Sequence, residues 1–91
     1  MKDALYVRTR MDDVLTATPP QSETAEARFK AQSETWIWCF NFGKLRTEVE
    51  IKNRIQNCED ELKCFEFMGE KSPTKLNPIH EKIKILKDVL N

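Results

Sequence analysis

Three cysteines and a single histidine are the side chains of this sequence that could hold a metal ion: Cys39, Cys58, Cys64 and His80. Structural zinc sites take their ligands in close pairs such as Cys-x-x-Cys, and the sequence contains no such pair. Cys58 and Cys64 would also lie about 240° apart around a shared helix. We therefore expect no metal ion and no cofactor, and we interpret the cysteines as small apolar side chains.

Catalysis by a general acid or base needs a titratable side chain in a shielded pocket with a second group beside it. His80 has only Glu81 as a neighbouring acid, and the run Glu59-Asp60-Glu61 would spread its carboxylates around a helix. The only glycines are Gly43 and Gly69, which are too few for a phosphate-binding loop. We predict that the chain is not an enzyme.

The aromatic residues are the strongest functional signal. Four of them alternate within seven residues, at Trp36, Trp38, Phe40 and Phe42, and Phe67 follows near a predicted turn. Such residues can simply form the core of a small domain, but aromatic side chains also concentrate at the centres of protein interfaces. We predict that these five residues bind a protein partner, which is either a second copy of the chain or a larger complex.

A lysine-rich segment near the C-terminus offers an alternative partner. Its lysines could bind the phosphates of DNA or RNA from one helix face, and they are Lys75, Lys82, Lys84 and Lys87. Nucleic acid is not favoured, because 15 basic residues are balanced by 15 acidic ones and only Arg28 stands beside an aromatic residue, Phe29. The same lysines could instead face an acidic helix.

Two amphipathic helices are predicted in the C-terminal part, at 44–68 and 78–91. Each carries an apolar seam with spacings of three and four residues. The seams are Ile51, Ile55, Cys58, Leu62 and Phe65 in the first helix, and Ile79, Ile83, Leu86 and Leu90 in the second. Asn77-Pro78 is a helix-start signal, and Gly69 is placed to end the first helix. The short connection predicts an antiparallel hairpin.

The distribution of charge favours this hairpin. Residues 59–70 contain five acidic residues and one lysine, a balance of −4, whereas 71–87 contain five lysines and one glutamate, a balance of +4. Folding the second segment back would set basic residues beside acidic ones. An exposed ion pair contributes only about 0 to 1 kcal/mol, so we expect charge to select the register of the helices rather than to stabilise them strongly.

The N-terminal part is less regular. Residues from Ser22 onward are good helix formers, with Ser22 placed as the N-cap. The stretch 35–42 fits a strand by its alternation and a helix by its four-residue spacings, and we favour the helix because both flanks are helical in composition. Residues 1–21 show no helical repeat and end near Pro19-Pro20, so we predict an extended arm.

The 91 residues are enough for one small domain. We predict an all-α fold in which the C-terminal antiparallel helical hairpin is preceded by an aromatic-rich helical segment and an extended N-terminal arm. The arm comprises 1–21 and the single helical domain 22–91. The alternative fold is α+β, with short strands at about 4–9 and 35–42.

The predicted function is protein binding without catalysis, as in an adaptor, accessory subunit, assembly protein or inhibitor that docks through its aromatic segment and arm. The alternative is a small DNA- or RNA-binding regulator. No apolar run approaches the roughly 20 residues of a membrane helix, and Met1–Leu15 does not resemble a signal peptide. We therefore expect no membrane partner. Because three cysteines cannot all pair within one chain, we expect the protein in the cytoplasm or another reducing intracellular compartment.

Overall fold

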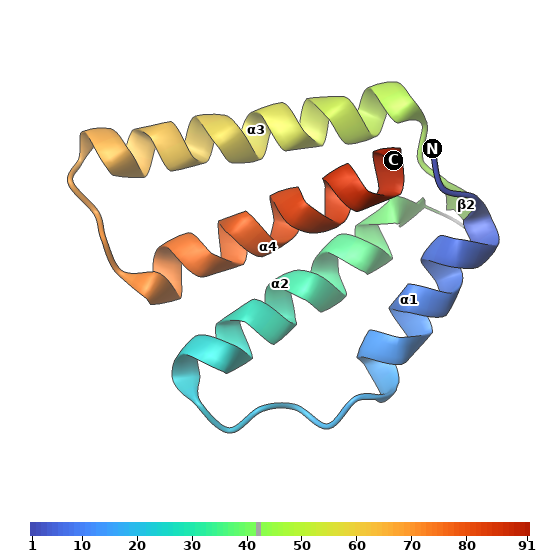
Figure 1. Cartoon of the computed structure of the whole chain (residues 1–91), viewed down its shortest axis with the longest axis horizontal. Coiled ribbons are helices and arrows are strands. Elements are labelled where there is room, and N and C mark those ends of the chain that lie inside the picture. Colours follow the sequence, from blue (N-terminus) through green and yellow to red (C-terminus); the bar gives the residue numbers. More distant parts are fainter. Residues whose placement is uncertain (42) are drawn as a thin grey trace.

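The described residues, 1–41 and 43–91, form four α-helices and a two-stranded β-ladder (Figure 1). In this computed structural model the elements are α1 (Ala4–Thr16), α2 (Glu23–Cys39), β1 (Phe40–Asn41), β2 (Lys44–Leu45), α3 (Glu48–Phe67) and α4 (Pro73–Leu90). The mostly helical structure confirms the all-α class. Within the described residues, none of the helices combines the length and the apolar character needed to cross a bilayer.

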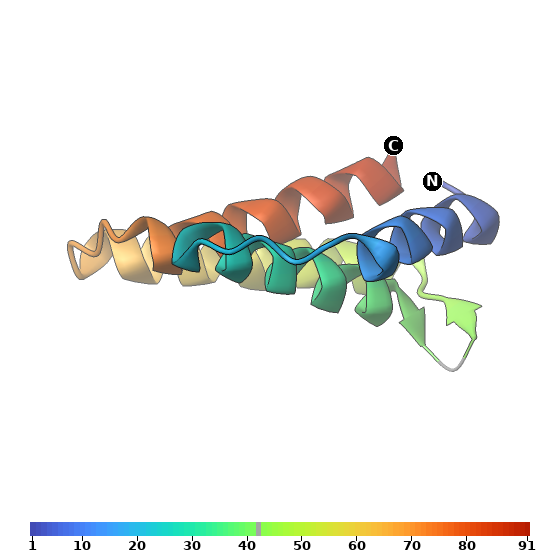
Figure 2. The ribbon, with the colours of Figure 1, turned by 90° about the horizontal axis from the view of Figure 1, so that it is seen from below.

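The central helix of the fold is α4. It lies between α3, which runs in the opposite direction, and α2, which runs in the same direction, while α1 lies beside α2 (Figure 1). Seen from below, the helices form a thin layer (Figure 2), and the molecule measures 39 × 32 × 21 Å. A helix with neighbours on two sides must bury a wide arc of its surface. On α4 the residues Ile79, Ile85, Leu86 and Val89 are accordingly at most 7% exposed.

All four helices contribute to one hydrophobic core. Three residues of the predicted seam, Ile51, Ile55 and Cys58, are buried on α3, and they face the buried residues of α4. From the other side, α2 contributes Trp36 and Cys39, while α1 contributes Val7. The apolar residues are thus shared among four helices, and the two C-terminal helices do not form the core alone.

A tight chain reversal connects α2 to α3. Phe40 pairs with Leu45, and Asn41 pairs with Lys44, in antiparallel register. Gly43 has a φ of +76°, a backbone conformation that residues with a Cβ rarely adopt. Because Phe40–Asn41 and Lys44–Leu45 are paired strands, α3 begins at Glu48 and not at residue 44. A capping box closes the start of α3: the Glu50 N–H donates to Thr47 Oγ1 and the Thr47 N–H donates to Glu50 Oε1, each at 3.3 Å.

The prediction of an extended arm is wrong for residues 4–16, which form α1. The Asp3 carboxylate caps this helix by accepting the Tyr6 N–H at 2.9 Å. The Tyr6 hydroxyl donates to Asp88 Oδ2 at 2.6 Å, and Val7 is fully buried. The two prolines restrict only the connection after α1, and contacts with the end of α4 stabilise a helix that has no clear apolar repeat of its own.

The alternative α+β fold is also wrong. Its first proposed strand, at about 4–9, lies in α1, and most of its second, at 35–42, lies in α2. Only Phe40–Asn41 is extended there, and Phe42 is outside the described residues. Helix α2 continues through Trp36 and Trp38, in agreement with the four-residue spacing of the aromatic residues that favoured a helix.

The last helix starts at Pro73, five residues before the predicted start at residue 78. The Ser72 carbonyl accepts the N–H groups of Lys75 and Leu76 at 3.1 and 3.0 Å. Pro78 therefore lies inside α4, where its missing N–H removes one backbone hydrogen bond. Ser72-Pro73 and Asn77-Pro78 both match the start signal, and the helix forms from the first of them.

Candidate functional site

The aromatic residues predicted to bind a partner do not form one surface. Trp36 is 5% exposed and belongs to the core, whereas Trp38 and Phe40 are half-buried near the end of α2. Phe67 is 93% exposed at the end of α3, at the opposite end of the molecule (Figure 1). The structure therefore separates Phe67 from the aromatic segment, and Phe42 lies outside the described residues.

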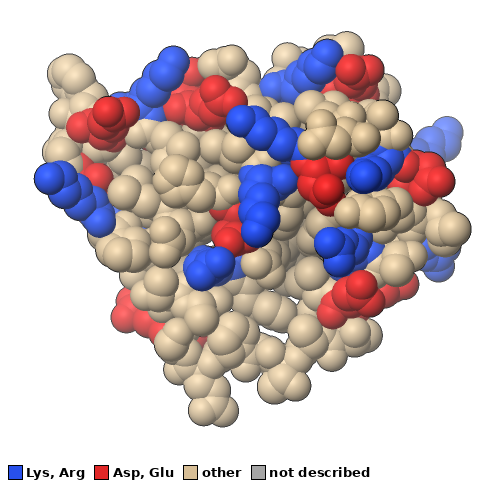
Figure 3. Space-filling model, viewed as in Figure 1, with Lys and Arg blue, Asp and Glu red and all other residues tan. Residues whose placement is uncertain are grey.

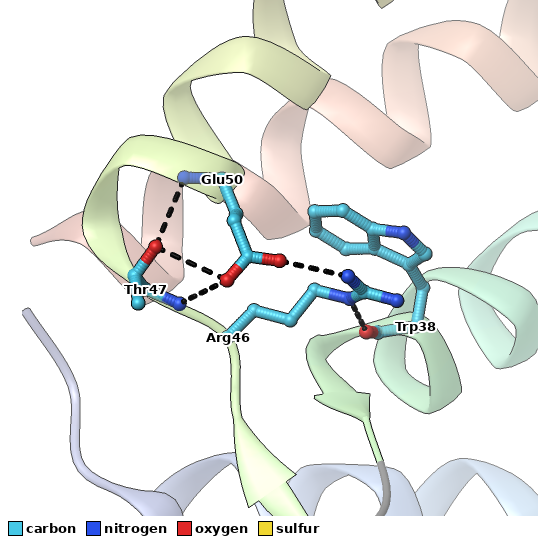
Figure 4. Close-up of polar contacts among 4 residues, drawn as sticks. All are labelled: Trp38, Arg46, Thr47 and Glu50. Atoms are coloured by element: carbon cyan, nitrogen blue, oxygen red, sulfur yellow. Dashed lines mark hydrogen bonds and ion pairs between the residues drawn. The ribbon is translucent and has the colours of Figure 1, made fainter.

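Trp38 is held in place by two arginines, Arg46, which is drawn in Figure 4, and Arg54. The guanidinium groups of Arg46 and Arg54 lie 4.4 and 5.1 Å from its ring centroid. Arg46 Nε also donates to the Trp38 carbonyl at 2.6 Å, and Arg46 Nη1 donates to Glu50 Oε2 at 2.8 Å. These hydrogen bonds from Arg46 and from Thr47 lower the pKa of the Glu50 carboxyl. The contacts fasten the end of α2 to the start of α3, which is a structural role for Trp38.

A second polar cluster fastens α2 to α4. Both carboxylate oxygens of Glu81 accept hydrogen bonds, from Arg28 at 2.7 and 3.2 Å and from Gln32 at 3.1 Å. Burial alone would raise the pKa of Glu81, but these hydrogen bonds and the nearby positive charge outweigh it and lower the pKa. Glu81 lies in the wall of a cleft of about 530 Å³ between α1, α2 and α4. The Glu81 carboxylate therefore links α4 to α2 through hydrogen bonds to both of its oxygens.

The cysteines behave as small apolar side chains at two of three positions. Cys39 and Cys58 are buried, and Cys64 is exposed on α3. Burial raises the pKa of the Cys39 thiol to about 11, against the attraction of Arg46 and Arg54, and it raises the pKa of Cys58 as well. Among the described residues, no three metal-ligand side chains gather where they could share an ion.

The four lysines proposed for nucleic-acid binding point to two sides of α4. At 100° per residue, Lys75 and Lys82 lie within about 20° of one another, whereas Lys84 is about 180° from Lys75. Lys75 is paired with Glu70 at 3.1 Å, the one recorded ion pair between the acidic and basic segments within the described residues. Lys84 and Lys87 line the cleft that also contains Glu81. The structure therefore does not bring the four lysines together.

A shallow hollow of about 390 Å³ lies where the N-terminal helix meets the aromatic segment. Its lining includes Arg8 and Met11 from α1, Ile37 from α2 and Phe40 from β1. Ile37 is 49% exposed. This hollow brings together residues of the aromatic segment and of the predicted arm.

Phe67 and Met68 are the most prominent exposed apolar pair along the described sequence. They are 93% and 62% exposed, and Cys64, one turn earlier, is exposed as well. The helix end that carries them is well defined, and Gly69 has a φ of +72° there. The Gly69 N–H donates to the Glu66 carbonyl at 3.1 Å, and the Glu70 N–H donates to the Phe65 carbonyl at 2.9 Å. These two hydrogen bonds form a Schellman motif, so the pair is displayed at a fixed helix end.

Beside this pair lies a hollow of about 310 Å³ between the end of α3 and the start of α4. It is lined by Leu62, Glu66, Gly69, Glu70, Lys71, Leu76 and His80. Most of its accessible wall is apolar. We call Phe67, Met68 and this hollow together the α3–α4 tip.

No protein-family model, curated protein or solved structure is detectably similar to the chain. Sequence reasoning selected Phe67 but missed the hollow beside it, because the hollow joins Leu62 and Leu76 from two helices. It also missed the contact between Arg28 and Glu81, because no local pattern links residues 53 positions apart.

Proposed function

We propose that the chain is a non-catalytic protein-binding module that docks through the α3–α4 tip. The observation that carries this proposal is the 93% exposure of Phe67 on a well-capped helix end. Burying a phenylalanine side chain is favourable by about 1.5–3 kcal/mol, and the exposed Phe67 gains this free energy only when another molecule covers it. Phenylalanine and methionine are also enriched at interface centres relative to the remaining protein surface.

Other functions receive less support from the geometry. The best-formed polar cluster, around Glu81, has every carboxylate oxygen bonded and its charge balanced, which suits a fastening role better than catalysis. Binding to DNA or RNA through Lys75, Lys82, Lys84 and Lys87 would require lysines from two sides of α4 to reach one phosphate backbone. The exposed thiol of Cys64 is suited to a reducing compartment, where it would stay unpaired.

Site-specific photo-crosslinking tests the docking surface. The full chain would be produced in cells with a benzophenone amino acid in place of Phe67, of Ile37 beside the other hollow, or of Asn57, an exposed polar control on α3. We expect residue 67 to yield one discrete adduct of defined mass and residue 57 to yield none. Adding Met68→Ser to the chain labelled at 67 should reduce the yield, because Met68 belongs to the same surface.

Two results would contradict the proposal. An adduct from residue 37 alone would move docking to the hollow between α1 and α2, away from the tip. Equal adducts from all three positions, or none from any of them, would remove the case for a specific docking surface. Circular dichroism of each labelled chain shows that it is folded, which keeps a negative result interpretable.

A further inference from the structure

We infer that the partner that covers Phe67 is a second copy of this chain, arranged by a two-fold axis so that Phe67 of each copy enters the tip hollow of the other. This inference rests on the proposed function. It starts from the fact that one end of the molecule presents both an exposed apolar side chain and an apolar hollow. A surface that carries both parts of a contact can pair with itself, and a two-fold arrangement makes the contact twice and closes.

The dimensions of the two parts agree. An apolar cavity of about 150 Å³ already accepts a benzene molecule, and the tip hollow measures about 310 Å³. It therefore has room for the benzyl group of Phe67. Leu62 and Leu76 supply apolar wall, and the ring of His80 lies at the same hollow.

Phe67 cannot fill the hollow of its own chain. Leu62 and Glu66, which line the hollow, are about 40° apart on α3, whereas Phe67 is about 140° from Leu62 and 100° from Glu66. The Schellman hydrogen bonds at Gly69 fix the helix end in this orientation. Phe67 therefore lies beside the hollow but off the face of α3 that lines it, so filling the hollow needs another molecule.

Charge at the tip supports a two-fold arrangement. Residues 59–70 have a balance of −4 and 71–87 a balance of +4, so the tip joins an acidic segment to a basic one. Acidic and basic groups both appear at this end in Figure 3. A two-fold axis through the tip would set the acidic segment of each copy against the basic segment of the other. The formal net charge of zero also means that two copies approach without long-range repulsion.

One specific pair follows from this arrangement. Glu66, next to Phe67, and Lys71, which lines the hollow, form no ion pair within the described part of the chain. When Phe67 enters the hollow of the second copy, the adjacent Glu66 is carried toward Lys71 of that copy. Glu70 is already paired with Lys75 and is not needed for this contact.

Analytical ultracentrifugation of the purified full chain tests the inference. The tip is small, so the dimer belongs to the weak class of interfaces, and the protein should be measured from about 10 µM to 1 mM. We expect the mass to rise from one chain toward two with concentration. Phe67→Ser should weaken the dimer at least about 100-fold, because two phenyl groups lose their burial.

A matched control is available on the same helix. Val49 is 66% exposed and lies on the same side of α3 as Phe67 but at the other end, so Val49→Ser should leave the dimer unchanged within about threefold. The single charge reversals Glu66→Lys and Lys71→Glu should each weaken the dimer, and combining them should restore it. Because Phe67 is exposed, Phe67→Ser keeps the fold, which circular dichroism verifies.

A monomer at 1 mM would overturn the inference, and so would equal dimerisation by the Phe67→Ser and Val49→Ser variants. Failure of this inference is distinguishable from failure of the proposed function. A monomer whose residue 67 still crosslinks in cells to a protein of another mass leaves docking through the tip standing and removes only the second copy. A monomer without any specific crosslink from residue 67 removes both.

Discussion

Trp36 and Phe67 are both large aromatic residues from the predicted partner-binding set, and the structure gives them opposite energetic roles. Trp36 is 5% exposed in the core, and Phe67 is 93% exposed. We expect Trp36→Ala to lower the free energy of unfolding by about 3–5 kcal/mol, the usual cost of deleting a buried aromatic side chain. Phe67→Ala should change it by no more than about 0.5 kcal/mol, as substitutions on an exposed surface do.

The magnitude for Trp36 follows from its burial. An aromatic residue buries about 150–250 Å² on folding, and at about 25 cal/mol per Å² this corresponds to about 4–6 kcal/mol for a residue that is almost fully enclosed. Alanine retains part of that area, which leaves about 3–5 kcal/mol. A domain of 91 residues has a total stability of about 5–14 kcal/mol, so Trp36→Ala removes a large share of it.

Urea denaturation followed by far-ultraviolet circular dichroism measures both variants against the unmodified chain. The slope of the free energy with urea concentration should stay the same, so the change appears as a shift of the midpoint. The measurement is made at low micromolar concentration, where the weak dimer is dissociated. A loss above about 1 kcal/mol for Phe67→Ala, or below that value for Trp36→Ala, would refute the assignment of one residue to the core and the other to the surface.

Three further changes test the contacts that hold the helices together. Glu81→Ala leaves Arg28 and Gln32 without their acceptor, so urea denaturation should show a free energy of unfolding lower by about 1–3 kcal/mol. The pKa of Glu81 is lowered from 4.5 in the folded chain. The stability difference between the two chains should therefore be full above pH 4.5 and shrink as the pH falls through the folded-state pKa. Burial raises the pKa of the Cys39 thiol from 9.0 to about 11. The free energy of unfolding should therefore fall by up to about 3 kcal/mol as the pH rises between these values, and Cys39→Ala should flatten that fall. Thr47→Ala removes the capping box and should lower the midpoint by the equivalent of about 0.5–2 kcal/mol.

Features that depend on neighbouring residues could be predicted from the sequence. The seam residues Ile51, Ile55 and Cys58 are at most 7% exposed, as their spacing predicts. The N-cap at Ser22 is confirmed by the hydrogen bond from the Ala25 N–H to its hydroxyl, at 3.2 Å. These features are set within one or two helical turns, so the local pattern contains the information that determines them.

Features that depend on distant partners could not be predicted. α1 is stabilised by contacts such as that of Tyr6 with Asp88, which are 82 positions apart, and no repeat within residues 1–21 indicates them. The burial of Trp36 is of the same kind, because its place in the core depends on residues of the other helices. Phe67 differs, because it lies about 140° around α3 from Leu62 of the predicted seam and stays outside the core.

The account depends most on the claim that Phe67 is open to solvent in the isolated chain and covered when the chain docks. Fluorine NMR of the full chain with 4-fluorophenylalanine at residue 67 reports on that ring directly. We predict a large shift of the signal between H₂O and D₂O in dilute protein, and a much smaller one at millimolar concentration or with a partner identified by crosslinking. A signal that is already insensitive to D₂O in dilute protein, or that stays fully sensitive under every docking condition, would contradict the account.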